Sequence, residues 1–380
     1  MNHPQGPVTN GAFFYLQCRT RGLEINSELP YHDENMMCET PGRPVPDGKA
    51  LEMKKRVLVT GRLPEELTAD LQRQFDVIAN KEDLPMERAT ILHAIEDREG
   101  LLCMLSDTID AKLMDQAPRL NVIAGMGAGF NHIDLKAATK RGIMVSNTPG
   151  ANTEAAADMA FGLMLATARR IVEGDHRTRA GEFKYWAPLL FLGRMVSGKT
   201  LGLVGMGQIG KAMVNRARGF SMRVIYFDPY RLDPEMEKAM GVEYVDLMTL
   251  LKTADFISLH VPLTSDTRHL IGNPEFAMMK DSACLINASR GPVIDEKALV
   301  AALRKGLIAG AGLDVYEDEP LLAPGLADLP NAVLTPHLGS ATLESRTAMA
   351  AQAALNLKEG LGGKVLPNIV NPEVAMNRRS

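Results

Sequence analysis

Three polar residues in the last quarter of the chain, Arg290, Glu319 and His337, each follow a short run of apolar residues. An arginine offers a planar, permanently charged fork that binds a carboxylate through two hydrogen bonds. A histidine can give a proton near neutral pH, and a neighbouring glutamate stabilises the charged imidazole and raises its pKa. Together, residues of these types could hold an anion and move a proton.

Each of the three residues also has a purely structural interpretation. Arg290 precedes a Gly-Pro pair and could satisfy carbonyl groups in a turn. Glu319 lies in the acidic run Glu-Asp-Glu-Pro, whose first member, Glu317, we interpret as a solvated neighbour. His337 follows a proline and could be a half-buried hydrogen-bonding residue. The joint occurrence of all three at the ends of predicted strands favours chemistry, because ligands of parallel sheets bind at those ends.

The elements that would position these residues are short β-branched runs that alternate with helical segments, which predicts parallel sheets with crossover helices. A first group of strands is predicted at Val57–Thr60, Val77–Ala79, Gly100–Leu105, Val122–Ala124 and Met144–Val145. A second series of six strands is predicted at Leu201–Val204, Arg223–Phe227, Phe256–His260, Cys284–Asn287, Ile308–Leu313 and Val333–Leu334. The predicted fold class is α/β, with two doubly wound, Rossmann-like parallel sheets.

A glycine turn opens the second series, in the segment Gly205-Met-Gly-Gln-Ile-Gly210 between a predicted strand and a predicted helix. In a dinucleotide site the first two glycines, Gly205 and Gly207, allow a tight turn and a close approach of the pyrophosphate, and Gly210 permits close helix packing. The helix amides of Gln208 and Ile209 would then face the phosphates.

An acidic residue, Asp228, ends the next predicted strand, 18 residues beyond Gly210. An acid at this place accepts hydrogen bonds from the ribose hydroxyls and repels a 2′-phosphate. Asp228 therefore favours NAD over NADP. NADP stays an alternative because Arg231 lies close by in the sequence.

The predicted domains follow from the place of the glycine turn. Residues 53–150 and 338–372 are predicted to form one discontinuous, flavodoxin-like substrate domain, and residues 151–337 the NAD-binding domain. Residues 1–52 mix Gly, Pro, Asn and charge, so we interpret them as a disordered extension or a mis-assigned start. The helix predicted over 153–172 is apolar nearly all round, which indicates burial between domains or in a homodimer.

Composition argues against three classes of protein, namely those that bind nucleic acid, those that bind a metal through cysteines and those that span a membrane. The formal net charge of −4 over 380 residues gives no electrostatic footprint for nucleic acid. The four cysteines are scattered without the spacing of a metal site, which suits a reducing, cytoplasmic protein without a bound metal. Because no apolar run approaches the ~20 residues of a membrane span, we expect no membrane association.

From Met53 to about Pro372 the chain resembles the D-isomer-specific 2-hydroxyacid dehydrogenases. The resemblance rests on three segments in order: Asn287-Ala-Ser-Arg-Gly-Pro-Val-Ile-Asp-Glu, Gly312-Leu-Asp-Val-Tyr-Glu-Asp-Glu-Pro and Leu334-Thr-Pro-His-Leu-Gly-Ser-Ala-Thr. It implies that Arg290 grips the substrate carboxylate and polarises its carbonyl, that His337 donates the proton, and that Glu319 keeps His337 charged.

The resemblance implies further contacts. For the substrate they are Leu105, the amides of Ala128 and Gly129, and Trp186 reaching in from a partner subunit. For the cofactor they are Thr153, Val261, Pro262, Thr267, Ala288, Ser289, Asp314, His337 and Gly339, in addition to the glycine turn and Asp228. The segments 100–107 and 185–189 look most like glyoxylate and hydroxypyruvate reductases. The chain departs from those enzymes at Asp228, where many have basic residues, and at Gly127, where a small hydroxyl residue is common.

The expected activity is hydride transfer between a nicotinamide cofactor and C2 of a small 2-oxo or D-2-hydroxy acid. Formate dehydrogenase is an alternative of the same fold, but those enzymes carry an amide where this chain has Glu319. An NAD-sensing corepressor is an alternative from another class. That branch adds long tails, whereas the one tail expected here is residues 1–52.

Overall fold

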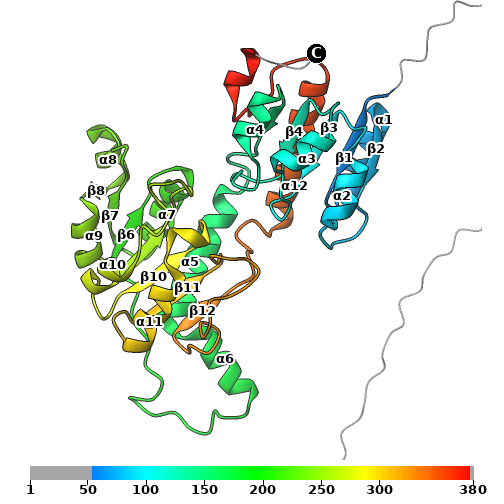
Figure 1. The fold of residues 1–380 in the computed structure, drawn as a ribbon. Coiled ribbons are helices and arrows are strands. Elements are labelled where there is room, and N and C mark those ends of the chain that lie inside the picture. Colours follow the sequence, from blue (N-terminus) through cyan, green and yellow to red (C-terminus); the bar gives the residue numbers. More distant parts are fainter. Residues whose placement is uncertain (1–53, 377–380) are drawn as a thin grey trace, which may run out of the picture. The chain divides into compact units, whose positions relative to one another are not determined.

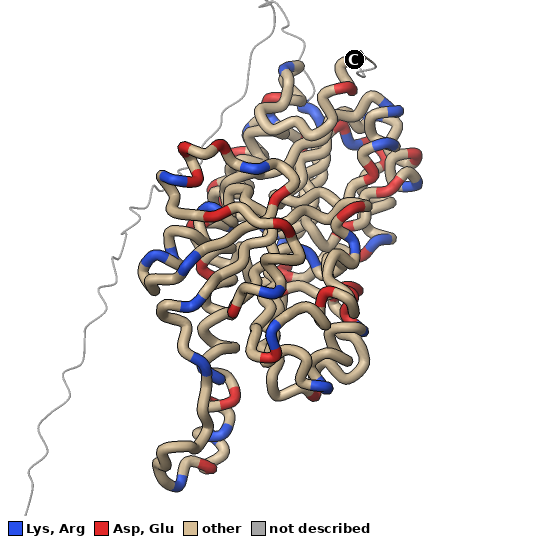
Figure 2. The backbone as a smooth tube through the Cα atoms, turned by 90° about the vertical axis from the view of Figure 1, so that its left-hand side faces the viewer, with Lys and Arg blue, Asp and Glu red and all other residues tan. Residues whose placement is uncertain are grey.

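A computed structural model describes residues 54–376. It contains two parallel β-sheets covered by helices (Figure 1), which confirms the predicted α/β fold class. The interpretation of residues 1–52 as an extension or a mis-assigned start lies outside the described residues. Acidic and basic residues are interspersed along the backbone (Figure 2). Along residues 54–376, no helix is both long and apolar enough to cross a membrane.

The first sheet has five strands in the order β2-β1-β3-β4-β5. Its strands are β1 (Arg56–Val59), β2 (Asp76–Ala79), β3 (Gly100–Cys103), β4 (Val122–Gly125) and β5 (Met144–Ser146). The helices between them are α1 (Glu65–Gln74), α2 (Arg88–Ala94), α3 (Ala111–Gln116) and α4 (Leu135–Lys140). The C-terminal helix α12 (Leu343–Leu361) returns to this sheet and contacts β3, β4 and β5. Its residues Ala353 and Leu357 share a buried core with Val57 and Leu102.

The second sheet has seven strands in the order β12-β11-β10-β9-β6-β7-β8, where the sequence predicted six. They are β6 (Thr200–Val204), β7 (Arg223–Phe227), β8 (Val242–Tyr244), β9 (Phe256–Leu259), β10 (Cys284–Asn287), β11 (Gly310–Leu313) and β12 (Ala332–Leu334). The missed strand, β8, is a three-residue edge strand. The strand order reverses beside β6, so the carboxyl ends of β6 and β9 form the crevice where such sheets bind ligands.

Helices cover both faces of the second sheet. They are α5 (Thr153–Arg169), α7 (Gln208–Gly219), α8 (Pro234–Met240), α9 (Leu247–Thr253), α10 (Asn273–Met278) and α11 (Glu296–Lys305). Helix α5 contacts β10, β11 and α7, which explains its small, largely apolar residues. Helix α6 (Ile171–Arg179) and the segment after it extend away from the sheet in Figure 1.

Candidate active site

The glycine turn lies between β6 and α7, and at two of its three glycines a side chain would clash with the backbone. Gly205 has a φ of +100°, and a Cβ added there would lie 2.7 Å from the carbonyl carbon of His260. A Cβ added at Gly210 would lie 2.3 Å from the carbonyl oxygen of Gly205. A Cβ added at Gly207 would meet no heavy atom of residues 54–376 within 4 Å, so open space borders the N-terminus of α7 in this part of the chain. This arrangement fits a pyrophosphate bound on helix amides.

Asp228 stands directly after β7 and faces this turn. Its carboxylate accepts hydrogen bonds from the backbone N–H of Met206 and of Tyr230, both at 2.8 Å. The carboxylate is therefore fixed across the turn, and an ionised carboxylate has further lone pairs for ribose hydroxyls. The position fits the role expected for it at an NAD site.

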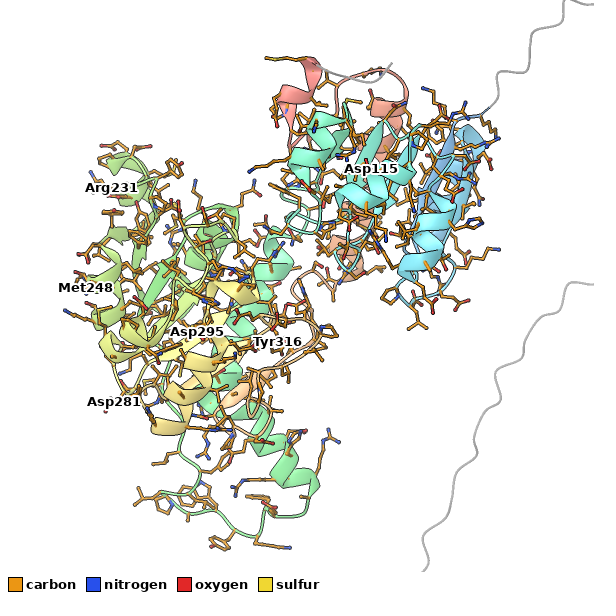
Figure 3. All side chains as sticks on the ribbon, viewed as in Figure 1. Asp115, Arg231, Met248, Asp281, Asp295 and Tyr316 are labelled. Carbon is orange, nitrogen blue, oxygen red and sulfur yellow. The ribbon has the colours of Figure 1, made fainter. Side chains whose placement is uncertain are left out.

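Arg231, the basis of the NADP alternative, is held by another residue. Its Nε and Nη2 donate to the two carboxylate oxygens of Glu237 at 2.8 and 2.9 Å, and its guanidinium lies over the ring of Tyr244. Tyr226 Oη also donates to Glu237 at 2.7 Å. The hydrogen bonds from Arg231 and Tyr226 lower the pKa of Glu237 to about 2. Figure 3 places Arg231 beside α8, the helix that carries Glu237.

Arg290, Glu319 and His337 follow three neighbouring strands, β10, β11 and β12, and the structure brings them around one cavity of about 470 Å³. His337 Nδ1 lies 2.8 Å from Glu319 Oε2, and the other oxygen of Glu319 accepts from the N–H of Tyr316 at 3.0 Å. This pairing leaves Nε2 of the imidazole for a substrate. The three residues singled out from the sequence therefore do meet in space.

The charges in this cavity stabilise each other. Burial lowers the pKa of Arg290, and the Glu319 carboxylate opposes that effect. Burial alone would raise the pKa of Glu319. The hydrogen bonds from His337 and from the N–H of Tyr316, with the charge of Arg290, nevertheless hold it below its usual range. Glu319 is thus an anion at neutral pH and can fix the orientation of the His337 ring.

The backbone of His337 has a φ of +53°, which is uncommon for a residue other than glycine. The fully buried carboxylate of Asp314 stabilises this turn, because it accepts from the N–H of Leu338 and of Gly339, both at 2.7 Å, and from Thr335 Oγ1 at 2.6 Å. Asp314, expected to contact the nicotinamide, is therefore engaged mainly by the loop that carries His337.

The Arg290 guanidinium lies against the backbone of Gly129. A Cβ added at Gly129 would lie 1.6 Å from Arg290 Nη2, so the guanidinium packs directly on that backbone. Leu105 lies similarly on Gly127, where an added Cβ would be 2.5 Å from Leu105 Cδ2. This contact gives a physical reason for the glycine at position 127, because any side chain there would displace Leu105.

A second cavity, also of about 470 Å³, adjoins Arg290 and His337 and gathers most of the remaining residues expected from the sequence. Those that line it are Leu105, Ala128, Gly129, Ile209, Val261, Pro262, Ala288, Ser289, Arg290, Asp314, His337 and Gly339.

Three further expected residues lie outside both cavities and outside the glycine turn. Thr153 forms a hydrogen bond with the side chain of Gln208 at 3.1 Å, and Thr267 donates to the carbonyl of Pro262 at 2.6 Å within its own turn. Trp186 is 78% exposed on the segment after α6.

Asn131 and His132 are among the residues of the first cavity that were missed from the sequence. Burial and the charge of Arg290 lower the pKa of His132 to about 4, so this imidazole is neutral at physiological pH. Its Nε2 lies 3.8 Å from Cys103 Sγ. Asn131 donates to the carbonyl of Leu263 at 3.0 Å. The sequence signal was their place directly after the glycines of Gly127-Ala-Gly-Phe-Asn-His.

The interpretation of Glu317 as a solvated neighbour is wrong. Its side chain is only 21% exposed, and its Oε1 lies 2.6 Å from His269 Nε2. The contact joins residues 48 positions apart, so no local pattern in the sequence could reveal it.

Known proteins resemble this chain over most of its length. A model of the D-isomer specific 2-hydroxyacid dehydrogenase NAD binding domain matches residues 161–339. A glyoxylate reductase of Thermococcus litoralis is 48% identical over 326 residues, which cover 85% of this chain and 98% of the relative.

Solved structures agree. The TT0316 protein of Thermus thermophilus has a TM-score of 0.76 at 45% identity, over 83% of this chain and 99% of the other. An NADPH-dependent glyoxylate/hydroxypyruvate reductase of Sinorhizobium meliloti, in complex with NADP and malonate, has a TM-score of 0.74 at 31% identity, over 86% and 99%. These matches confirm the resemblance seen in the sequence. The chain therefore belongs to the D-isomer specific 2-hydroxyacid dehydrogenase family, and it is an NAD(P)-dependent oxidoreductase that acts on a CH–OH group.

Proposed function

We propose that the protein reduces a short 2-oxo acid, glyoxylate or hydroxypyruvate, with NADH as the preferred cofactor. The observation that carries the proposal is the convergence of Arg290 and the hydrogen-bonded His337–Glu319 pair on one cavity. The names of the relatives, among them the Thermococcus litoralis glyoxylate reductase, support the choice of substrate.

In this proposal the substrate carboxylate binds where Arg290 packs on Gly129. A guanidinium next to backbone N–H groups suits an anion, and the residues Ala128 and Gly129 lie along the same cavity wall. The same arginine polarises the adjacent carbonyl of the substrate. Leu105 forms an apolar side of both cavities, which suits a substrate with a short carbon chain.

His337 delivers the proton through Nε2, because Nδ1 is taken by Glu319 at 2.8 Å. Glu319, as an anion, stabilises the imidazolium before transfer and holds the ring in position. A nicotinamide cofactor bound at this site would supply the hydride that C2 of the substrate receives. The residues that would hold it are the glycine turn, Asp228 and the lining of the second cavity, including Val261 and Asp314.

The preference for NADH rests on two observations. The Asp228 carboxylate is fixed beside the glycine turn, where it would repel a 2′-phosphate. Arg231 donates two hydrogen bonds to Glu237 and is engaged away from any phosphate. Because the structure of the Sinorhizobium meliloti reductase contains NADP, the activity of this protein has to be compared with NADH and with NADPH.

We further propose a homodimer formed through α5 and the segment that follows α6. That segment exposes large apolar side chains, namely Phe183, Trp186, Leu189, Leu192 and Met195. An apolar surface of this kind is typical of an interface. Trp186 would reach the active site of the partner subunit. A cytoplasmic location suits the free, buried thiols of Cys103 and Cys284.

The test follows NADH oxidation by its absorbance with glyoxylate, hydroxypyruvate, pyruvate and bulkier 2-oxo acids, and repeats it with NADPH. Wild type should turn over at least one short acid, and His337→Ala should lose most activity, since general acid catalysis contributes about 10²–10⁴-fold. An absence of turnover across the whole panel would refute the proposal. Equal or better use of NADPH would refute the cofactor preference.

A further inference from the structure

The residues that we place in catalysis stand on separate loops. Arg290 follows β10, and Glu319 follows β11 after an irregular stretch. The two loops touch at Gly291, where an added Cβ would lie 1.8 Å from the carbonyl oxygen of Tyr316. Because both loops lie beyond the hydrogen bonds of the sheet, the distance between the guanidinium and the carboxylate depends on this contact and on others between the loops.

His269, on the loop after β9, contacts both of these loops. Its backbone N–H donates to the carbonyl of Pro292 at 2.8 Å, two residues after Arg290. Its ring Nε2 lies 2.6 Å from Oε1 of Glu317, two residues before Glu319. The backbone of His269 has a φ of +52°, an uncommon conformation that such contacts must stabilise.

Glu317 is in turn held from a further side. Its second carboxylate oxygen accepts from the N–H of Glu296 at 3.4 Å, and the N–H of Glu317 donates to the Glu296 carboxylate at 3.3 Å. Arg268 Nη1 lies 3.8 Å from Glu317 Oε1. The Glu317 carboxylate therefore has a fixed place in which His269 is the closest side-chain partner.

We propose that His269, through Glu317, is a positioning residue that holds the Arg290 and Glu319 loops in register around His337. His269 touches no group expected to react, so its effect passes through the two loops. The inference rests on the proposed function, because it concerns the geometry of that same site. A misplacement of about 1 Å at a catalytic group can cost about 10²-fold in rate, so even a small loop shift is measurable.

The test uses variants of His269 that separate its backbone from its side chain. His269→Asn keeps a residue that tolerates positive φ but shortens the side chain, so the contact with Glu317 is lost. His269→Gln keeps the reach and a donor. His93→Asn is the matched control, because the His93 side chain is 90% exposed on α2.

We expect His269→Asn to lower kcat about tenfold, with less than about twofold change in NADH affinity measured by fluorescence, because the loops and not the dinucleotide site are disturbed. His269→Gln should recover most of the loss, and His93→Asn should match wild type. Glu317→Ala should lose at least as much kcat as His269→Asn, because it also removes the contacts of Glu317 with Glu296 and Arg268. The double variant should be no worse than Glu317→Ala, because both single changes remove the contact between His269 and Glu317.

Three results with an active wild type would overturn the inference. The His269→Asn variant could keep the full kcat, or it could lose kcat and NADH affinity equally. The double variant could also show a loss of kcat equal to the product of the two single losses. If His269→Asn fails to fold, as judged by circular dichroism, Glu317→Ala carries the same comparison against His269→Gln. A wild type without turnover of any 2-oxo acid overturns the proposed function itself, which makes the two failures distinguishable.

Discussion

Replacing Gly129 by alanine should disable substrate binding without a change in any charged residue. The added Cβ would lie 1.6 Å from Arg290 Nη2, whereas non-bonded heavy atoms settle at about 3.5 Å. The guanidinium must therefore move by about 2 Å. Because a misplacement of about 1 Å can cost about 10²-fold, we expect kcat/KM for glyoxylate to fall at least about 100-fold, or about 2.7 kcal/mol.

The assay compares kcat/KM for Gly129→Ala with that for Gly219→Ala. Gly219 is a control at the end of α7, where an added Cβ meets no heavy atom of the described residues within 4 Å. NADH affinity should be unchanged in both variants, and both should have the circular dichroism spectrum of wild type. A Gly129→Ala enzyme within about threefold of wild type would refute the placement of the substrate carboxylate beside Arg290 and Gly129.

Further expected outcomes concern the cofactor, pH and assembly. Glu237→Gln should release Arg231 and raise the ratio of kcat/KM for NADPH over NADH about tenfold, because a charge-assisted hydrogen bond is worth about 1.5–3 kcal/mol; an unchanged ratio would show that Arg231 has no access to the 2′ position. Burial lowers the pKa of His260 from 6.5 to about 4. In this pH range the unfolded chain binds a proton at His260 that the folded chain does not bind. The free energy of unfolding should therefore fall by about 3 kcal/mol as the pH falls from about 6.5 to about 4. Urea unfolding at about pH 7 and about pH 4.5 should show a smaller acid loss in His260→Gln, and an equal loss would contradict this reasoning. Trp186→Ala should raise KM for the 2-oxo acid more than for NADH, and light scattering that finds a monomeric wild type would contradict the proposed dimer.

Much of the fold could be predicted because its signals are local. Consecutive residues are enough to predict the β-branched strands of the sheets, the glycine turn before α7 and the start of α5 at Thr153. Strand β8 was missed because Val-Glu-Tyr is too short to show a pattern, and its place at the sheet edge comes from pairing with β7.

The site was harder to predict from the sequence where its geometry depends on side-chain contacts that form only in the folded chain. The types and order of Arg290, Glu319 and His337 were enough to single them out. The contact of Glu317 with His269 joins two loops that follow different strands, 48 residues apart. The hydrogen bonds from Arg231 to Glu237 join residues only six apart, but they depend on how the chain turns from β7 into α8. Secondary-structure propensity and residue spacing do not reveal such side-chain contacts. The interatomic distances in the folded chain reveal them.

The return of α12 to the first sheet has a consequence for how the chain is made on the ribosome. Met349, Ala353 and Leu357 of this helix complete the apolar core that begins with Val57, far earlier in the chain. One face of the first sheet therefore stays uncovered while the whole second sheet is synthesised. During synthesis, the apolar side chains of β3 and β4 that α12 covers would therefore stay exposed to solvent until this last long helix had emerged.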